Sequence, residues 1–175
     1  VTTATAAKLV PKLKRVQVME MSAPVSALAR LNVEGHTYLA VGAGRVLGIY
    51  KWENGRLKKH GFFDVGVHIV SVSVIKSFLV VTDAFRATVF LQWRVQGRAL
   101  KVLARSTEES LASDAEALVQ GNTLGLIVAD ADENVQVFGF DPEEGNRLLL
   151  QGDFHVGSNI TCFVPVLLHT LREGL

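Results

Sequence analysis

The chain has 175 residues, of which 49% are hydrophobic and 20% charged, and its formal net charge is +1. So apolar a sequence with so little net charge excludes intrinsic disorder, and its 15 glycines follow no fixed period, which excludes a collagen-like repeat. The single cysteine, Cys162, cannot form an internal disulfide, so a disulfide-stapled domain is excluded and a reducing compartment is favoured.

Three stretches of the chain share one pattern: a short apolar run, a turn residue, and a second apolar run that reaches an aromatic residue. The turn residue and the aromatic are ten positions apart in each stretch, at Gly42 and Trp52, Asp83 and Trp93, and Asp130 and Phe140. The turn residues follow one another at intervals of 41 and 47 residues. Apolar runs this short, bounded by Gly, Asp and Asn, are typical of buried strands and not of helices.

Each repeat is predicted to contain four strands. In chain order they are expected at residues 25–31, 38–41, 46–52 and 57–65, then 69–74, 78–81, 87–93 and 99–105, then 116–119, 124–128, 135–140 and 147–154. Four strands in a repeat of this length is the composition of a propeller blade. We therefore predict an all-β, WD40-like β-propeller segment of about three four-stranded blades. Because closed propellers typically have about four to eight blades, the segment is expected to belong to a larger multi-propeller protein or to need a partner at its edges.

The repeats also predict the boundaries along the chain. A basic N-terminal lead-in is expected at residues 1–15, propeller blades at 16–168 and a tail at 169–175. The blades are expected at about 22–65, 66–107 and 112–157, with the first strand of a next blade at 159–168. Residues 167–175 could instead begin a short helix.

The charges are divided along the chain. Residues 1–105 carry 16 Lys and Arg against 5 Asp and Glu, whereas residues 106–175 carry 2 against 12. The basic part could meet phosphate or an acidic protein, or the two ends of the domain could simply attract each other. With Trp52, Phe85 and Trp93 in the basic part, stacking on single-stranded RNA is conceivable. The candidate nucleic-acid or partner contacts are Lys12, Lys14, Arg15, Arg56, Lys58 and Lys59.

Other chemistries find little support in the sequence. Residues 130–134, Asp-Ala-Asp-Glu-Asn, imitate the start of a calcium loop, but Val135 stands where that loop needs glycine, which favours an ordinary turn. No zinc spacing, phosphate-binding loop or nucleophile elbow is present, and His155 is expected to be a half-buried histidine bonded to backbone. No apolar run is long enough for a membrane helix, and no signal peptide is expected. We therefore expect no enzyme, cofactor, metal, small-molecule substrate or membrane.

One group of motifs carries a resemblance to a known family. The motifs are Asp-Phe-His-Val-Gly at residues 153–157, the preceding Arg-Leu-Leu-Leu at 147–150, and the segments 22–28 and 125–134. From about residue 12 to residue 163 the chain resembles the C-terminal propeller region of the large (A) subunit of the cleavage and polyadenylation specificity factor. Residues 164–175 do not continue that family's pattern.

The resemblance implies a non-enzymatic scaffold in the nucleus that helps to hold the other subunits of a 3′-end processing complex on pre-mRNA. In that family base recognition falls largely to other subunits, so any RNA contact of this chain is expected to be indirect. The same superfamily is similar to the large subunit of the UV-damaged-DNA-binding complex and to a propeller subunit of splicing factor 3b. A ubiquitin-ligase adaptor and a splicing scaffold are therefore the alternatives, and no individual functional residue carries over.

Overall fold

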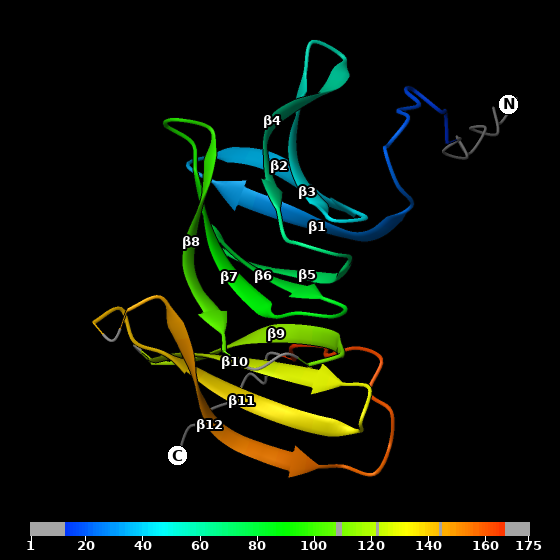
Figure 1. The fold of residues 1–175 in the computed structure, drawn as a ribbon. Coiled ribbons are helices and arrows are strands. Elements are labelled where there is room, and N and C mark those ends of the chain that lie inside the picture. Colours follow the sequence, from blue (N-terminus) through cyan, green and yellow to red (C-terminus); the bar gives the residue numbers. More distant parts are fainter. Residues whose placement is uncertain (1–12, 108–109, 122, 144, 167–175) are drawn as a thin grey trace, which may run out of the picture.

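The computed structural model describes residues 13–107, 110–121, 123–143 and 145–166 (Figure 1). Twelve strands and no helix lie in these residues. Consecutive strands pair antiparallel in three groups of four, which we call blades 1, 2 and 3. This arrangement confirms the predicted all-β, WD40-like propeller segment of three four-stranded blades.

The strand bounds repeat from blade to blade. Blade 1 consists of β1 (Val25–Val33), β2 (His36–Ala43), β3 (Val46–Glu53) and β4 (Arg56–Asp64). Blade 2 consists of β5 (Ile69–Ile75), β6 (Phe78–Asp83), β7 (Thr88–Arg94) and β8 (Ala99–Ser106). Blade 3 consists of β9 (Ala112–Gln120), β10 (Thr123–Asp130), β11 (Asn134–Phe140) and β12 (Arg147–His155).

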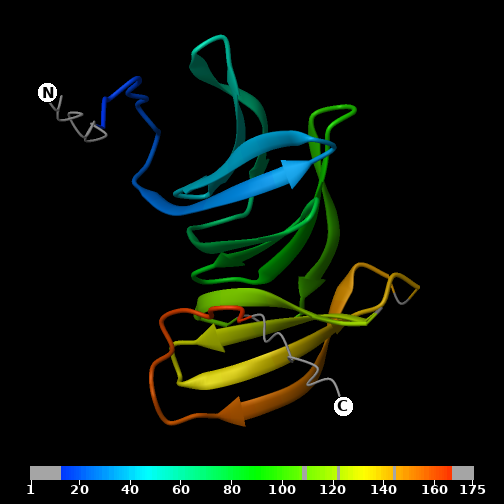
Figure 2. The ribbon, with the colours of Figure 1, turned by 180° about the vertical axis from the view of Figure 1, so that it is seen from behind.

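The blades follow one another as layers, with β1, β5 and β9 at the inner side and β4, β8 and β12 at the outer side (Figures 1 and 2). Blades 2 and 3 are also joined at the outer side, where β8 and β12 pair in parallel over two residues. The hydrophobic core is divided between the two junctions: one cluster of buried side chains lies between blades 1 and 2 and a second between blades 2 and 3. Each blade therefore depends on a neighbour to bury its apolar face.

The three aromatic residues of the repeat occupy equivalent places. Trp52, Trp93 and Phe140 each stand on the third strand of a blade, directly opposite a leucine of the fourth strand. The exposures of the two tryptophans nevertheless differ: Trp93 is 2% exposed and Trp52 is 52% exposed. Trp93 lies between two blades, whereas Trp52 stands on the face of blade 1 that is turned away from blade 2.

The position of Trp93 depends on a close approach of blade 1. Its ring meets the Tyr38 ring edge-on, with the centroids 5.6 Å apart. A Cβ on Gly61 of β4 would lie 2.7 Å from the Trp93 ring and 2.8 Å from the carbonyl oxygen of Arg98. Glycine at position 61 is therefore what allows the outer strand of blade 1 to cover this indole.

One strand prediction is wrong. Residues 159–166 form no strand, and positions 167–168 of the predicted strand lie outside the described residues, as does the tail at 169–175. The segment nevertheless follows blade 3 as a next blade would: the Ser113 hydroxyl donates to the Ile160 carbonyl at 2.8 Å, just as the Ser26 hydroxyl donates to the Ile69 carbonyl at the start of blade 2. Figure 2 shows it running beside blade 3. A strand exists only with a ladder partner, and the described residues supply none here.

Candidate functional site

The first part of the candidate site is a junction between the N-terminal segment and β4. The backbone N–H of Leu57 donates to Gln17 Oε1 at 2.8 Å, and Gln17 Nε2 donates to the Leu57 carbonyl at 3.5 Å. The Gln17 carboxamide therefore occupies both hydrogen-bonding groups of one residue on the free edge of blade 1. This pairing brings Lys14 and Arg15, which precede Gln17 closely and are exposed, towards β4.

An apolar groove of about 380 Å³ lies at this junction. Val16, Gln17 and Met19 line it from the N-terminal segment, and Trp52 and Leu57 line it from blade 1. Lys59 stands two positions after Leu57 on β4 and opposite Tyr50, so it shares the face of Trp52 and Leu57. Its ammonium lies 4.8 Å from the centroid of the Phe62 ring. We call Lys14, Arg15, Trp52, Leu57 and Lys59 the basic–aromatic face.

The structure divides the six predicted contact residues. Lys14, Arg15 and Lys59 belong to the basic–aromatic face, and Lys12 lies outside the described residues. Arg56 and Lys58 are also exposed, but they stand opposite Glu53 and Lys51 and therefore point to the other face of β4. The predicted basic run on β4 is thus shared between two faces. The alternation of a strand explains the division, and the sequence spacing already contained that signal.

Of the three aromatic residues proposed for stacking, Trp93 is excluded by burial. Phe85 is 60% exposed but stands in the turn between β6 and β7 of blade 2, outside the basic–aromatic face. Of these three, Trp52 is therefore the one that is exposed and shares a strand face with a cation, Lys59. The sequence did not single it out from Trp93, since both tryptophans occupy the same place in the repeat.

The carboxylate of Glu53 partly neutralises the positive charge on the face of β4 that carries Arg56 and Lys58. It lies 3.5 Å from Lys51 Nζ and 3.3 Å from His60 Nε2. Burial by itself would raise the pKa of Glu53, but the hydrogen bonds and charges of His60 and Lys51 outweigh it and leave that pKa below its ordinary value. Glu53 therefore stays ionised and partly neutralises the face that carries Arg56 and Lys58.

The carboxylate of Asp130, the first residue of the calcium-like segment, is used within its own turn. Asp130 Oδ1 accepts from the backbone N–H groups of Asp132 and Asn134, at 3.0 and 2.9 Å, which confirms the turn interpretation. Within the described residues no group of three His, Cys, Asp or Glu side chains is placed to hold a metal ion. His155 differs from expectation: it is exposed, and its Nδ1 lies 3.0 Å from the side-chain oxygen of Asn134, not from backbone. The described residues also contain no helix that is long and apolar enough to cross a membrane.

An ion pair at the edge of blade 1 leads to a prediction about acid. Arg45 Nε donates to the Asp64 carboxylate at 2.8 Å, and this hydrogen bond holds the pKa of Asp64 below its ordinary value. Because the pKa is lowered in the folded state, the pair stabilises the fold above the pKa of unfolded Asp, and that contribution is lost as the pH falls through the folded pKa. In Asp64→Asn the free energy of unfolding is therefore expected to fall less steeply as the pH is lowered. The difference from the wild type should be small, since the pair is solvent-exposed.

Urea denaturation at several pH values between neutral and acid checks this prediction. Asp153→Asn, which removes an exposed carboxylate of β12, is the matched control. An unchanged acid slope in Asp64→Asn, or the same change in both variants, would contradict the role of the ion pair.

The three antiparallel blades define a WD40-like β-propeller segment, and the basic–aromatic face lies on its first blade. The chain belongs to the family described as "CPSF A subunit region", whose model matches residues 7–173. The resemblance inferred from the Asp-Phe-His-Val-Gly motif is thereby confirmed.

The chain is 35% identical over 150 residues to the probable cleavage and polyadenylation specificity factor subunit 1 of Oryza sativa subsp. japonica, and 34% identical over 151 residues to that subunit of Arabidopsis thaliana. Each match covers 83% of this chain and 10% of the relative. It is 30% identical over 156 residues to Protein cft1 of Schizosaccharomyces pombe, covering 86% of the chain and 10% of the relative. The chain thus spans about a tenth of the length of these curated relatives.

Proposed function

We propose that the chain is a non-enzymatic scaffold segment of a nuclear complex that cleaves and polyadenylates pre-mRNA. One observation carries the proposal: the chain belongs to a family whose curated relatives are named as subunits of a cleavage and polyadenylation specificity factor. The architecture agrees with it, because stacked repeats form extended surfaces of the kind on which other proteins bind.

The proposal is tested by affinity purification of the tagged chain from nuclear extract, followed by mass spectrometry of the stable companions. Subunits of a 3′-end processing complex are expected. Recovery of a cullin ubiquitin ligase would favour the repair adaptor, and recovery of spliceosomal subunits would favour the splicing scaffold. Either result without polyadenylation factors would overturn the proposal. A variant with Lys14, Arg15 and Lys59 changed to Ala shows whether the basic–aromatic face takes part.

Direct contact with single-stranded RNA is the second candidate function. It is favoured by the exposed Trp52, which shares its face with Lys59, and by the exposed Lys14 and Arg15 of the adjoining N-terminal segment. Each cation that contacts a phosphate releases counterions, so the logarithm of the binding constant falls with the logarithm of salt by about 0.7 per contact. Changing Lys14, Arg15 and Lys59 together to Ala is expected to reduce that slope by about 2. Trp52→Ala is expected to weaken binding roughly 5- to 150-fold, which corresponds to the stacking of one base.

Fluorescence anisotropy with a labelled oligouridine over a series of salt concentrations measures both effects. The matched control is Arg56→Ala with Lys58→Ala, which removes cations of the same strand from the opposite face. Binding that is independent of salt, or an equal loss in the control, would rule out this face as the RNA contact.

A further inference from the structure

Two hollows lie at the end of blade 2 that carries its β5–β6 turn, one on each side of that turn. The first, of about 610 Å³, lies between blades 1 and 2, where the β1–β2 turn meets the end of β7. The second, of about 310 Å³, lies between blades 2 and 3, at the end of β9 and the start of β10. Figure 1 shows the β1–β2 turn, the β5–β6 turn and the end of β9 on one side of the molecule. Both walls of each hollow therefore belong to this chain.

The turn between the two hollows forms a fixed ridge. Lys76 and Ser77 are a two-residue turn between the paired residues Ile75 and Phe78, with a φ of 54° at Lys76. The Ser77 carbonyl accepts from the backbone N–H of Trp93 at 2.8 Å, which ties the turn to β7. Ser77 lines the first hollow and Lys76 lines the second. An extended chain that crosses this ridge would therefore meet both hollows on a surface that is already organised.

The first hollow has a largely polar lining, and we call it the polar hollow. Ser77, Gln92 and Gln96 are among its lining residues. None of these three side chains is engaged in a hydrogen bond within the described residues. Hydroxyl and carboxamide groups both donate and accept hydrogen bonds, so they suit the N–H and C=O groups of a peptide backbone.

The second hollow has a largely hydrocarbon lining, and we call it the apolar hollow. Ile75 and Phe78 line it from blade 2, and Val119 and Leu124 line it from blade 3. The Phe78 ring is stacked on the Phe90 ring with the centroids 5.5 Å apart, so this wall is supported from within the core. Val119 is 57% exposed. An aliphatic side chain that entered this hollow would remove apolar surface of both partners from water.

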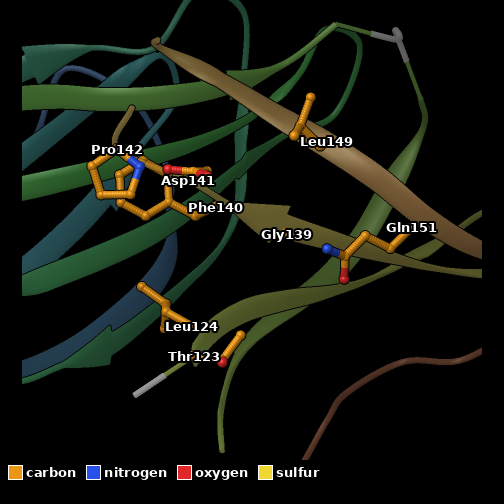
Figure 3. A pocket seen from close by; sticks show the side chains of 8 residues that line it. All are labelled: Thr123, Leu124, Gly139, Phe140, Asp141, Pro142, Leu149 and Gln151. Carbon is orange, nitrogen blue, oxygen red and sulfur yellow. The ribbon is translucent and has the colours of Figure 1, made fainter. Parts of the chain in front are cut away.

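Thr123 and Leu124, which line the apolar hollow, also border a hollow of about 510 Å³ on the face of blade 3 that is turned away from blade 2 (Figure 3). There the Gln151 side chain occupies the space over Gly139. In a closed propeller a further blade packs against such a face, so this hollow belongs to a blade junction. The polar and apolar hollows differ from it, because they are open although the blades on both of their sides are already packed together.

The charge of blade 2 is strongly positive and uncompensated. Residues 69–106 contain six Lys and Arg against a single acid, Asp83, which is fully buried. Three of the cations are in or beside the two hollows: Lys76 in the ridge, Arg94 in the lining of the polar hollow, and Arg98 in the β7–β8 turn. All three are exposed, and none is ion-paired with an acid of the described residues. A surface of this kind attracts an acidic ligand.

The lining favours a peptide over a nucleic acid. A single strand of RNA binds where its bases can stack on aromatic rings. Trp93 belongs to the lining of the polar hollow, but at 2% exposure it offers no free face for a base. The carboxylate of Glu34 in the same lining would repel a phosphate, whereas it can accept hydrogen bonds from the N–H groups of a peptide.

We propose that this end of blade 2 binds an extended, acidic peptide segment of a partner protein. An aliphatic side chain of the segment occupies the apolar hollow, and its backbone crosses the ridge and hydrogen-bonds with the side chains of the polar hollow. Its acidic side chains pair with Lys76, Arg94 and Arg98. The inference is independent of the function proposed above, because it depends on the lining and the charge of blade 2 and not on the complex in which the chain acts.

Fluorescence anisotropy of the purified chain with a labelled peptide, a leucine flanked on both sides by short runs of glutamate, tests the proposal. Binding is expected, and it should weaken as salt rises because opposite charges are screened. Glycine in place of the leucine should raise the dissociation constant about tenfold or more, the contribution of a buried aliphatic side chain. A peptide with lysine in place of each glutamate should not bind.

Variants of the chain test each part of the surface. Lys76→Ala together with Arg94→Ala is expected to raise the dissociation constant about threefold or more, since exposed ion pairs are individually weak. Glu34→Lys should lower it by a similar factor, because it replaces the acid in the lining of the polar hollow with a cation. Val119→Asp sets a carboxylate in the apolar hollow and should weaken the acidic peptide about tenfold.

The matched control is Arg86→Ala together with Arg105→Ala, which removes two cations of the same blade that line neither hollow. Circular dichroism shows that each variant is folded, and the peptide with glycine tests the apolar hollow if Val119→Asp unfolds. Absence of binding, equal binding of the lysine peptide, or an equal loss in the control would overturn the proposal. So would tighter binding of a labelled oligouridine that is lost in Lys76→Ala with Arg94→Ala, since the surface would then be an RNA site.

Discussion

Trp93→Ala is expected to lower the free energy of unfolding by about 3–5 kcal/mol, the range for removal of a large aromatic from a packed core. Trp93 is 2% exposed and lies in the cluster between blades 1 and 2, against the Tyr38 ring and the glycine at position 61. Loss of this side chain should therefore loosen the whole junction.

Urea denaturation, followed by circular dichroism, measures this effect. Trp52→Ala is the matched control: it deletes the same side chain at the equivalent position of blade 1 and should cost less than about 1 kcal/mol, because Trp52 is half exposed. Trp93→Phe should be milder than Trp93→Ala, since the indole Nε1 has no hydrogen-bond partner among the described residues. Equal losses at positions 52 and 93 would refute the different contributions of the two tryptophans to stability.

Asp83→Ala is expected to lower the free energy of unfolding by roughly 3 kcal/mol, because it removes a buried carboxylate that accepts three backbone hydrogen bonds and leaves their donors without that acceptor. Asp83 is fully buried at the end of β6. Its Oδ2 accepts from the backbone N–H groups of Val67 and His68 at 2.7 and 3.3 Å, and its Oδ1 accepts from that of Phe85 at 3.0 Å. One carboxylate thus holds both the connection from blade 1 to blade 2 and the turn after β6.

The same denaturation experiment, with Asp132→Ala as control, checks the prediction. Asp132 is an exposed carboxylate in the corresponding turn of blade 3, and its removal should change stability by less than about 0.5 kcal/mol. Asp83→Asn keeps an acceptor oxygen and should fall between the wild type and Asp83→Ala. A loss in Asp83→Ala no greater than that in Asp132→Ala would show that the connection is held by other contacts.

Much of the fold could be predicted from the sequence because its signals are local. Strand pairing and turns depend on the alternation of apolar residues and on residues such as Asn54 and Gly55, both of which have positive φ in the turn between β3 and β4. The strand bounds were least accurate in β9, which begins at Ala112, four residues before its predicted start. Its first residues are mixed polar and apolar, so no periodic signal marks them. The strand prediction at residues 159–166 was wrong for the opposite reason. Their apolar pattern favours a strand, but no described segment pairs with them.

The candidate site was only partly predictable. The basic run on β4 was visible, but its division between two faces follows from the register of β3 and β4, which sets Lys59 opposite Tyr50 and Lys58 opposite Lys51. The approach of Lys14 and Arg15 to this strand depends on the pairing of Gln17 with Leu57, forty residues further along the chain. No local pattern reports a contact over such a separation.

The sequence by itself determined the repeat: three blades, their turns, and an aromatic residue at one place in each. Only the tertiary structure decided what that aromatic does. Trp52 and Trp93 have the same local surroundings, yet one is exposed and the other buried, because burial depends on which face of the sheet meets a neighbouring blade. Local propensity acts along the strand, whereas solvent exclusion depends on the packing of whole sheets.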